Sequence, residues 1–168
     1  IHKTRMKIII INKDTLLYDE FKFKCSIGKK GITSRKVEGD KKTPRGTYSL
    51  GPVYIRKDRI QKVQTKLKKI KITKKMGWCD DSNSKFYNKP TNINQKIRCE
   101  KLFRKDNSYN ILIPINFNTK RPVKNKGSAI FLHLTRNYKK TLGCIAIKEK
   151  DMIILLKLIN KKTKITII

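Results

Sequence analysis

The chain has 168 residues, enough for one compact domain whose core needs neither metal nor disulfides for stability. Lys and Arg number 43 against 12 Asp and Glu, and the resulting charge of +31 points to a polyanionic partner such as nucleic acid, anionic membrane or acidic wall polymer. The sequence contains no helix-turn-helix, zinc-finger spacing or aromatic RNA-binding strand, so nucleic acid is not the expected partner.

The origin of the charge is open between function and genome composition. Lys, Ile and Asn are abundant together, whereas alanine occurs only at Ala129 and Ala146. Codons for the abundant residues can consist of A and T alone, so a genome rich in A and T would produce the same excess of lysine. The lysines are also spread along the chain, which is typical of a solvated surface.

The first part of the chain alternates apolar and polar residues as β-strands do. The run KTRMKIIIINK predicts a first strand, and its apolar run of five is shorter than a signal-peptide core, so no signal peptide is visible. Apolar residues at 21, 23, 25 and 27 have the period of two of a half-buried strand. Pro and Gly residues then frame two short predicted strands at 47–50 and 53–55.

The middle of the chain has weaker patterns. Residues 58–76 are rich in lysine and are compatible with an exposed strand or an irregular connection. Residues 77–95 carry turn-forming residues together with Trp78 and Tyr87, which predicts an ordered loop pinned by aromatic side chains. No stretch is long enough to span a bilayer.

The remaining residues predict three strands, a helix and a closing strand. Pro114 places the first of these strands at a sheet edge or at a bulge. Apolar residues of the helix recur at i, i+3, i+4 and i+7, and acidic residues lie near its positive end. The predicted segments are strands at 110–117, 128–135 and 144–147, a helix around 149–159 and a strand at 163–168. The expected fold over residues 1–168 is a single mostly β domain of α+β class with one or a few helices.

The cysteines do not form a metal motif. They never occur as a CxxC pair, and the chain's histidines are His2 and His133, so we expect no metal and no cofactor. Cys25 fits a small apolar core residue. The pair Cys79 and Cys99 could be linked or free in an oxidising compartment.

His133 and Cys144 form the candidate chemical pair. Alternation along a strand places His133 on one face with Phe131, and Cys144 on one face with Ala146. The connection at 136–142 can join two neighbouring antiparallel strands, which would bring the imidazole beside the thiol.

Such a pair has the elements of nucleophilic catalysis. A neighbouring imidazolium favours the thiolate, and histidine can take the thiol proton and later deprotonate an amine. Gly143 lets a substrate carbonyl approach the backbone, so that the Cys144 N–H faces a developing oxyanion. Thr141 could order the turn through its hydroxyl. The alternative is structural, because a cysteine in an apolar strand is commonly a core residue and a lone histidine commonly a satisfied one.

Longer motifs show a resemblance. The segment HLTRNYKKTLGCIAI is similar to the signature of YkuD-type L,D-transpeptidases, in which a histidine precedes a Ser/Thr-x-Gly-Cys motif. GDKKTPRGTYSLGPV resembles the TPxG segment of that family, and GWCDD and GSAIFLHL resemble a compact alphaproteobacterial-type branch. The resemblance covers roughly residues 25–159.

The resemblance implies a β-sandwich or barrel-like fold and a cysteine acyltransferase of bacterial peptidoglycan in the cell envelope or periplasm. It implies that Cys144 is the nucleophile and that His133 is the base. It also implies that Gly143 and the Cys144 backbone form the oxyanion environment, and that Thr141 supplies the hydroxyl of the motif. The partner is then a peptidoglycan stem peptide, with no membrane span in this chain and a monomeric state. Expected substrate-binding residues are Arg45, Arg136, Trp78, Tyr87 and Asn88.

Alternatives remain open beside this reading. Water as acceptor would make the chain an L,D-carboxypeptidase, and loss of turnover would leave a basic polyanion-binding protein. Trp78, Tyr87 and Asn88 could anchor the loop, and any single arginine could be an ordinary solvated charge. Many family members have Arg where this chain has Ala146, and Leu142 stands where the branch would have Glu, which bears on donor or acceptor preference.

Overall fold

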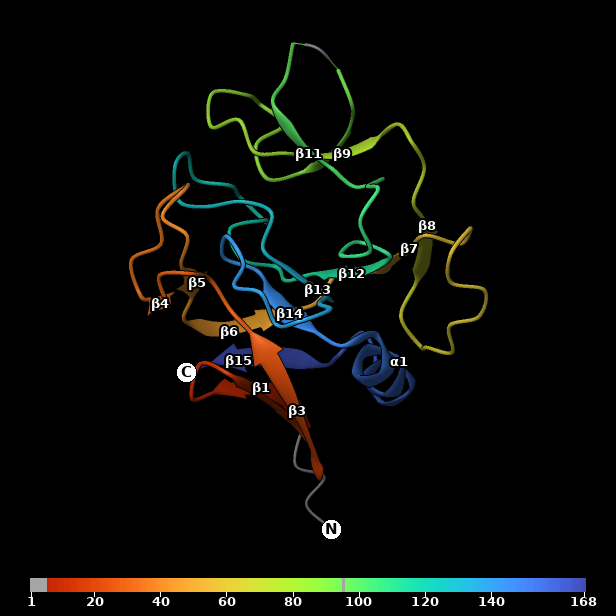
Figure 1. The fold of residues 1–168 in the computed structure, drawn as a ribbon. Coiled ribbons are helices and arrows are strands. Elements are labelled where there is room, and N and C mark those ends of the chain that lie inside the picture. The colour runs from red at the N-terminus through yellow and green to blue at the C-terminus, as the bar shows by residue number, and fades with distance from the viewer. Residues whose placement is uncertain (1–5, 95) are drawn as a thin grey trace.

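The computed structural model describes residues 6–94 and 96–168, and these residues form three β-sheets and one α-helix (Figure 1). The large sheet has ten strands, in the spatial order β6 (Gly46–Ser49), β15 (Lys164–Ile167), β1 (Lys7–Ile11), β2 (Thr15–Tyr18), β3 (Phe21–Ser26), β14 (Ile145–Ile147), β13 (Phe131–Leu134), β12 (Ile111–Pro114), β7 (Val53–Ile55) and β8 (Lys69–Lys71). The smaller sheets are β10 (Pro90–Asn92), β9 (Met76–Cys79) and β11 (Cys99–Lys101), and the pair β4 (Ile32–Thr33) and β5 (Thr43–Pro44). The helix is α1 (Glu149–Leu158).

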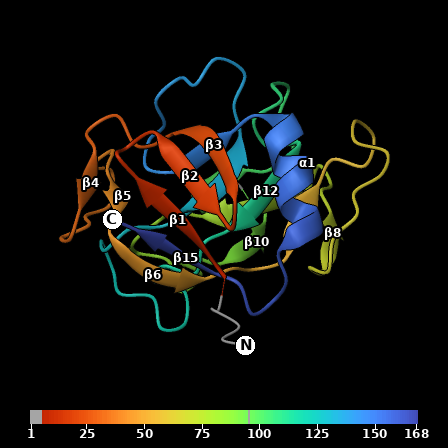
Figure 2. The same ribbon diagram turned by 90° about the horizontal axis from the view of Figure 1, so that it is seen from below.

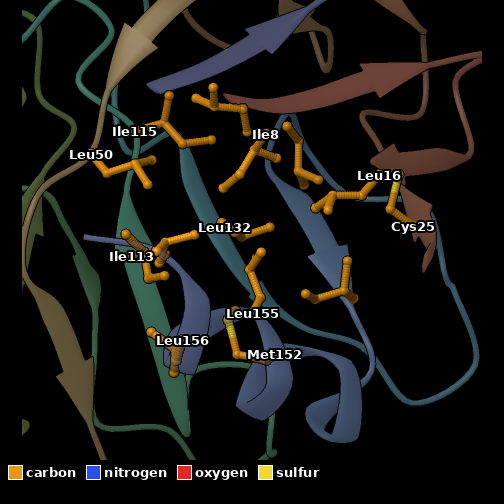
Figure 3. Close-up of a cluster of buried hydrophobic side chains, with 14 of the residues drawn as sticks. Ile8, Leu16, Cys25, Leu50, Ile113, Ile115, Leu132, Met152, Leu155 and Leu156 are labelled. Atoms are coloured by element: carbon orange, nitrogen blue, oxygen red, sulfur yellow. The ribbon is translucent and has the colours of Figure 1, made fainter. Parts of the chain in front are cut away.

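The large sheet curls around one hydrophobic core. Apolar residues on its inner face come from both halves of the sheet, so Ile8 and Leu16 meet Ile113 and Leu132 in one interior (Figure 3). These four side chains are completely buried, and each contributes about 1.5–3 kcal/mol to folding through the apolar surface it removes from water.

Helix α1 closes this core from one side. Met152, Leu155 and Leu156 recur at i, i+3 and i+4, so they share one face of the helix, and all three are fully buried. Seen from below, α1 lies in front of the central strands (Figure 2). Among the described residues, no helix combines the length and the apolar character that crossing a membrane requires.

A second hydrophobic cluster lies on the other face of the central strands. Leu112 and Phe131 point away from α1 and pack against Trp78 and Leu102 from the β9–β11 region. The rings of Trp78 and Phe131 meet edge to face, with their centroids 5.1 Å apart. The small β9–β11 sheet therefore sits over the large sheet, away from α1 (Figure 1).

The structure confirms a mostly β fold with one helix, and the helix begins and ends within one residue of its predicted bounds. The first strand begins at Lys7, and residues 3–5 of its predicted range lie outside the described residues. Four strands, β2, β4, β5 and β11, had no predicted counterpart.

Two local predictions are wrong. The predicted loop at 77–95, whose last residue lies outside the described residues, contains most of β9 and all of β10, because both pair into a sheet completed by the later β11. Strand β12 is interior in the large sheet and not an edge strand. Pro114 is tolerated there because it is the last residue of β12, and the pairing with β7 involves only Ile111 and Leu112.

Replacing Leu132 by alanine should destabilise the protein by about 3 kcal/mol, because a completely buried side chain of the central β13 would leave a cavity. Urea unfolding monitored by circular dichroism measures this change. The matched control is Leu142→Ala, whose side chain is 67% exposed and whose loss should change stability by less than about 0.5 kcal/mol. Equal losses in the two variants would contradict the assigned core.

Candidate active site

His133 and Cys144 are brought together by two neighbouring parallel strands. In the register of β13 and β14, His133 lies opposite Ala146 and Leu132 lies opposite Ile145. Because side chains alternate along a strand, Cys144 shares the face of Ala146 and His133, while Leu132 and Ile145 enter the core on the other face. Both functional candidates therefore point to the same side of the sheet.

The predicted antiparallel arrangement of these strands is wrong. The connection after β13 passes outside the sheet and returns to the start of β14, so the two strands run in the same direction. The returning segment is held at the end of β3, where Thr141 N donates to Ile27 O at 3.0 Å and Lys29 N donates to Thr141 O at 2.9 Å. Contacts with β3, far earlier in the chain, thus decide the direction of β14.

Both side chains line a cavity of about 1000 Å³. His133, Cys144 and the small side chain of Ala146 line it together. Its walls carry charged side chains of both signs, and these are Lys29, Lys36, Glu38, Lys41, Asp80, Arg98, Glu100, Arg104, Arg136, Lys139 and Lys140. A volume of this size can hold several residues of a peptide.

The Cys144 sulfur is fixed by two backbone contacts. Its thiol donates to the carbonyl oxygen of Ala129 at 3.2 Å, and it accepts the N–H of Phe131 at 3.3 Å. The residue as a whole is 9% exposed. The sulfur is therefore buried in the protein yet borders the cavity.

The turn before Cys144 is organised by two threonine hydroxyls. Thr141 Oγ1 donates to Cys144 O at 2.5 Å and accepts the N–H of Gly143 at 3.1 Å. Thr43 Oγ1 donates to Gly143 O at 2.7 Å. The Gly143 N–H is thus already used, whereas the Cys144 N–H has no hydrogen-bond partner among the described residues.

The His133 ring has one assigned nitrogen. Its Nδ1 lies 3.0 Å from the carbonyl oxygen of Leu134, which can only accept, so Nδ1 carries the hydrogen and Nε2 keeps its lone pair. This contact with a backbone carbonyl orients the imidazole. The ring of Tyr109 packs edge-on against the imidazole with the centroids 5.3 Å apart, and the Tyr109 hydroxyl donates to Glu100 at 2.9 Å.

Burial favours the neutral form of both candidates. It lowers the pKa of His133 to about 4 and raises the pKa of Cys144 to about 12. At neutral pH the resting pair is therefore a thiol beside a neutral imidazole. The sequence suggested a thiolate stabilised by an imidazolium, and the difference arises because both groups are removed from water.

Comparisons with known proteins bear on this arrangement. The chain matches a protein family described as the L,D-transpeptidase catalytic domain, YkuD, over residues 1–167. The chain belongs to the YkuD family. Among curated proteins none matches it.

A solved structure has the same fold. Bd1075 of Bdellovibrio bacteriovorus superposes with a TM-score of 0.50 and 14% sequence identity, covering 98% of this chain and 48% of that one. The likeness at this identity concerns the fold alone, and this chain spans about half the length of that protein. The YkuD family acts on peptidoglycan and is generally associated with the cell envelope. Membership of its compact alphaproteobacterial-type branch stays a prediction.

The two arginines expected to bind substrate in this YkuD domain lie in different places. Arg136 borders the cavity on the connection between β13 and β14. Arg45 is not among the described residues that line it, and its Nη1 donates to Ser34 at 2.9 Å beside a separate, smaller hollow. Geometry therefore favours Arg136 over Arg45 for contact with a ligand in the cavity.

Trp78, Tyr87 and Asn88 lie behind the cavity wall and support it. Asn88 Oδ1 accepts the indole N–H of Trp78 at 2.8 Å and the backbone N–H of Ala129 at 3.0 Å. Tyr87 donates to Glu38 at 2.6 Å. These contacts hold the segment whose carbonyl receives the Cys144 thiol, which agrees with the loop-anchoring alternative.

Sequence patterns did not single out several of the cavity residues. Tyr109 and Lys36 lie in segments without a recognisable motif, and a single lysine cannot be distinguished among 43 basic residues. The other cysteines are free thiols, and Cys79 faces Cys99 across β9 and β11. Within the described residues no three His, Cys, Asp or Glu side chains converge as metal ligands.

The protonation states predict how Cys144 reacts with alkylating agents. Because burial raises its pKa to about 12, alkylation by iodoacetamide should accelerate about tenfold per pH unit between about pH 7 and pH 10, without a plateau. Mass spectrometry of the Cys144 peptide measures this rate separately from the other cysteines. A rate that levels off below about pH 7 would instead reveal a preformed thiolate–imidazolium pair.

Proposed function

We propose that this chain is a cysteine acyltransferase of bacterial peptidoglycan, with residues 1–168 acting as one catalytic domain. The donor is a tetrapeptide stem, and the bond broken is the L,D amide between diaminopimelate and the terminal D-alanine. The observation that carries the proposal is that Cys144 and His133 open into one cavity from the same face of adjacent strands. Family membership supports the same reaction class.

In the acylation step, Nε2 of His133 takes the thiol proton as the Cys144 sulfur attacks the amide carbonyl carbon. The carbonyl oxygen becomes negatively charged, and the free Cys144 N–H can donate to it. The imidazolium then protonates the amine of D-alanine as the C–N bond breaks. A thioester between Cys144 and diaminopimelate remains.

In the transfer step, an amine from a second stem attacks the thioester and His133 accepts its proton. The C–S bond breaks, the thiol is restored, and the product is a 3-3 cross-link. Water in place of the amine would release a tripeptide, so the same residues would perform L,D-carboxypeptidase chemistry. The outcome depends on how well a bound acceptor excludes water from the thioester.

The charge of the cavity suits a substrate of this kind. Lys139, Lys140 and Arg136 lie on the connection that borders Cys144, and peptidoglycan stems carry carboxylates that such cations attract. The carboxylates Glu38, Asp80 and Glu100 lie elsewhere on the wall. A ligand carrying both carboxylates and an amine therefore has partners of both signs.

Replacing Cys144 by alanine should abolish D-alanine release from purified tetrapeptide muropeptides, because the nucleophile is lost. It should also abolish acylation by a carbapenem, seen as a gain in intact mass. His133→Ala should slow acylation by about 10²-fold or more, since the proton acceptor is removed. Liquid chromatography with mass spectrometry measures all three effects.

The matched control is Cys99→Ala, because Cys99 is a free thiol that does not line the cavity within the described part of the chain. This variant should keep full activity. Persistence of D-alanine release and carbapenem acylation in Cys144→Ala would refute the proposal. Salt-sensitive binding to anionic wall polymer without any acylation would favour a non-catalytic polyanion-binding protein.

The products separate the two enzymatic outcomes. With donor tetrapeptide and a second stem as acceptor, we expect 3-3 cross-linked dimers by mass spectrometry. Incubation in H₂¹⁸O checks the alternative, because hydrolysis places ¹⁸O in the new tripeptide carboxylate and aminolysis does not. Labelled tripeptide as the sole product would assign carboxypeptidase activity.

A further inference from the structure

Lys36 is a buried cation at the candidate active site. Its residue exposure is only 8%, and it lines the cavity together with Cys144. Lysine is seldom buried unless its charge is paired, and here the ammonium donates to the carboxylate of Asp40 and to the Val37 carbonyl at 3.3 Å. Lys36 is therefore held in place and not part of the solvated lysine surface.

The stem of Lys36 runs past two glycines with positive φ. A Cβ at Gly127, where φ is +110°, would lie 2.9 Å from Lys36 Cγ and 3.2 Å from its Cε. A Cβ at Gly143, where φ is +142°, would lie 3.7 Å from Lys36 Nζ and 2.9 Å from Lys42 O. Because neither glycine has a side chain, the Lys36 stem can pass Gly127 and its ammonium can approach Gly143, the residue before Cys144.

The Lys36 ammonium has capacity for a further partner. It carries three N–H groups, and two are accounted for by Asp40 and Val37. Burial raises the pKa of Cys144, the nearby Glu100 carboxylate acts in the same direction, and the charges of Lys36 and Arg104 oppose them. Lys36 approaches Gly143, whereas Glu100 lies in β11 and Arg104 follows that strand.

We propose that Lys36 is a further active-site residue that stabilises negative charge beside Gly143 and Cys144. The charge is first that of the thiolate formed when His133 takes the proton, and then that of the oxyanion near the Cys144 N–H. This role rests on the proposed function, and it supplies the cation that a neutral resting thiol lacks. It goes beyond His133, which is charged only while its ring holds the proton, whereas Lys36 stays charged throughout the reaction.

A purely structural role would look different. Asp40 already organises the loop by itself, because its carboxylate accepts the N–H of Val37 and the N–H of Lys42, both at 2.9 Å. If Lys36 only neutralised Asp40, loss of either partner would disturb the loop in the same way. If Lys36 acts on Cys144, loss of the Lys36 charge should slow alkylation of Cys144, and loss of the Asp40 charge should accelerate it.

The test compares Lys36→Met with Asp40→Asn by the rate of Cys144 alkylation with iodoacetamide at about pH 9. Methionine keeps an unbranched stem beside Gly127 and removes the charge, so alkylation should slow about threefold or more for each unit that the pKa rises. Asp40→Asn leaves the ammonium unneutralised and should accelerate alkylation. Lys22→Met, an exposed site on β3 with the same change in net charge, should have no effect.

An unchanged rate in Lys36→Met, or slower alkylation in both variants, would overturn the role. If Lys36→Met does not fold, as judged by circular dichroism, Asp40→Asn alone decides through the sign of its effect. Alkylation requires no turnover, so this result is independent of the peptidoglycan reaction. The Cys144→Ala assay tests that reaction separately.

Discussion

The parallel pairing of β13 with β14 is the constraint on which the candidate site depends. Its register sets His133 opposite Ala146, and strand alternation then places Cys144 on the same face. The other face of these strands carries Leu132 and Ile145 into the main core. This pair of strands thus separates the apolar face that stabilises the fold from the face that opens into the cavity.

Burial on that face has an electrostatic consequence. A thiol and an imidazole removed from water both favour their neutral forms, so the resting site holds a weak nucleophile. Reactivity then depends on groups that meet the charge as it develops. In our proposal that charge is stabilised by the Cys144 N–H and by the buried Lys36 ammonium, which lies near Gly143. In the resting protein Asp40 neutralises Lys36, which limits the cost of burying that cation.

The scaffold around the sulfur is held by long-range contacts. Ala129 has φ of +53°, a conformation that residues with a Cβ rarely adopt, and its carbonyl accepts the Cys144 thiol. Its N–H is bound by Asn88, which Trp78 holds in turn. The strained Ala129 is thus stabilised by contacts from the region of the small β9–β11 sheet. That sheet therefore supports the site, although Trp78 does not line the cavity.

Local patterns in the sequence determined most strands, α1 and the choice of Cys144 and His133, because side-chain period and short motifs need only neighbouring residues. They did not reveal that β14 runs parallel to β13, that β12 is interior, or that β9 pairs with β11. Those features arise from hydrogen bonds between residues far apart in the chain, and an alternating pattern marks which face of a strand is apolar without naming its partner. Lys36 illustrates the same limit. Only the tertiary structure, by passing it between Gly127 and Gly143, distinguished this lysine from the solvated ones.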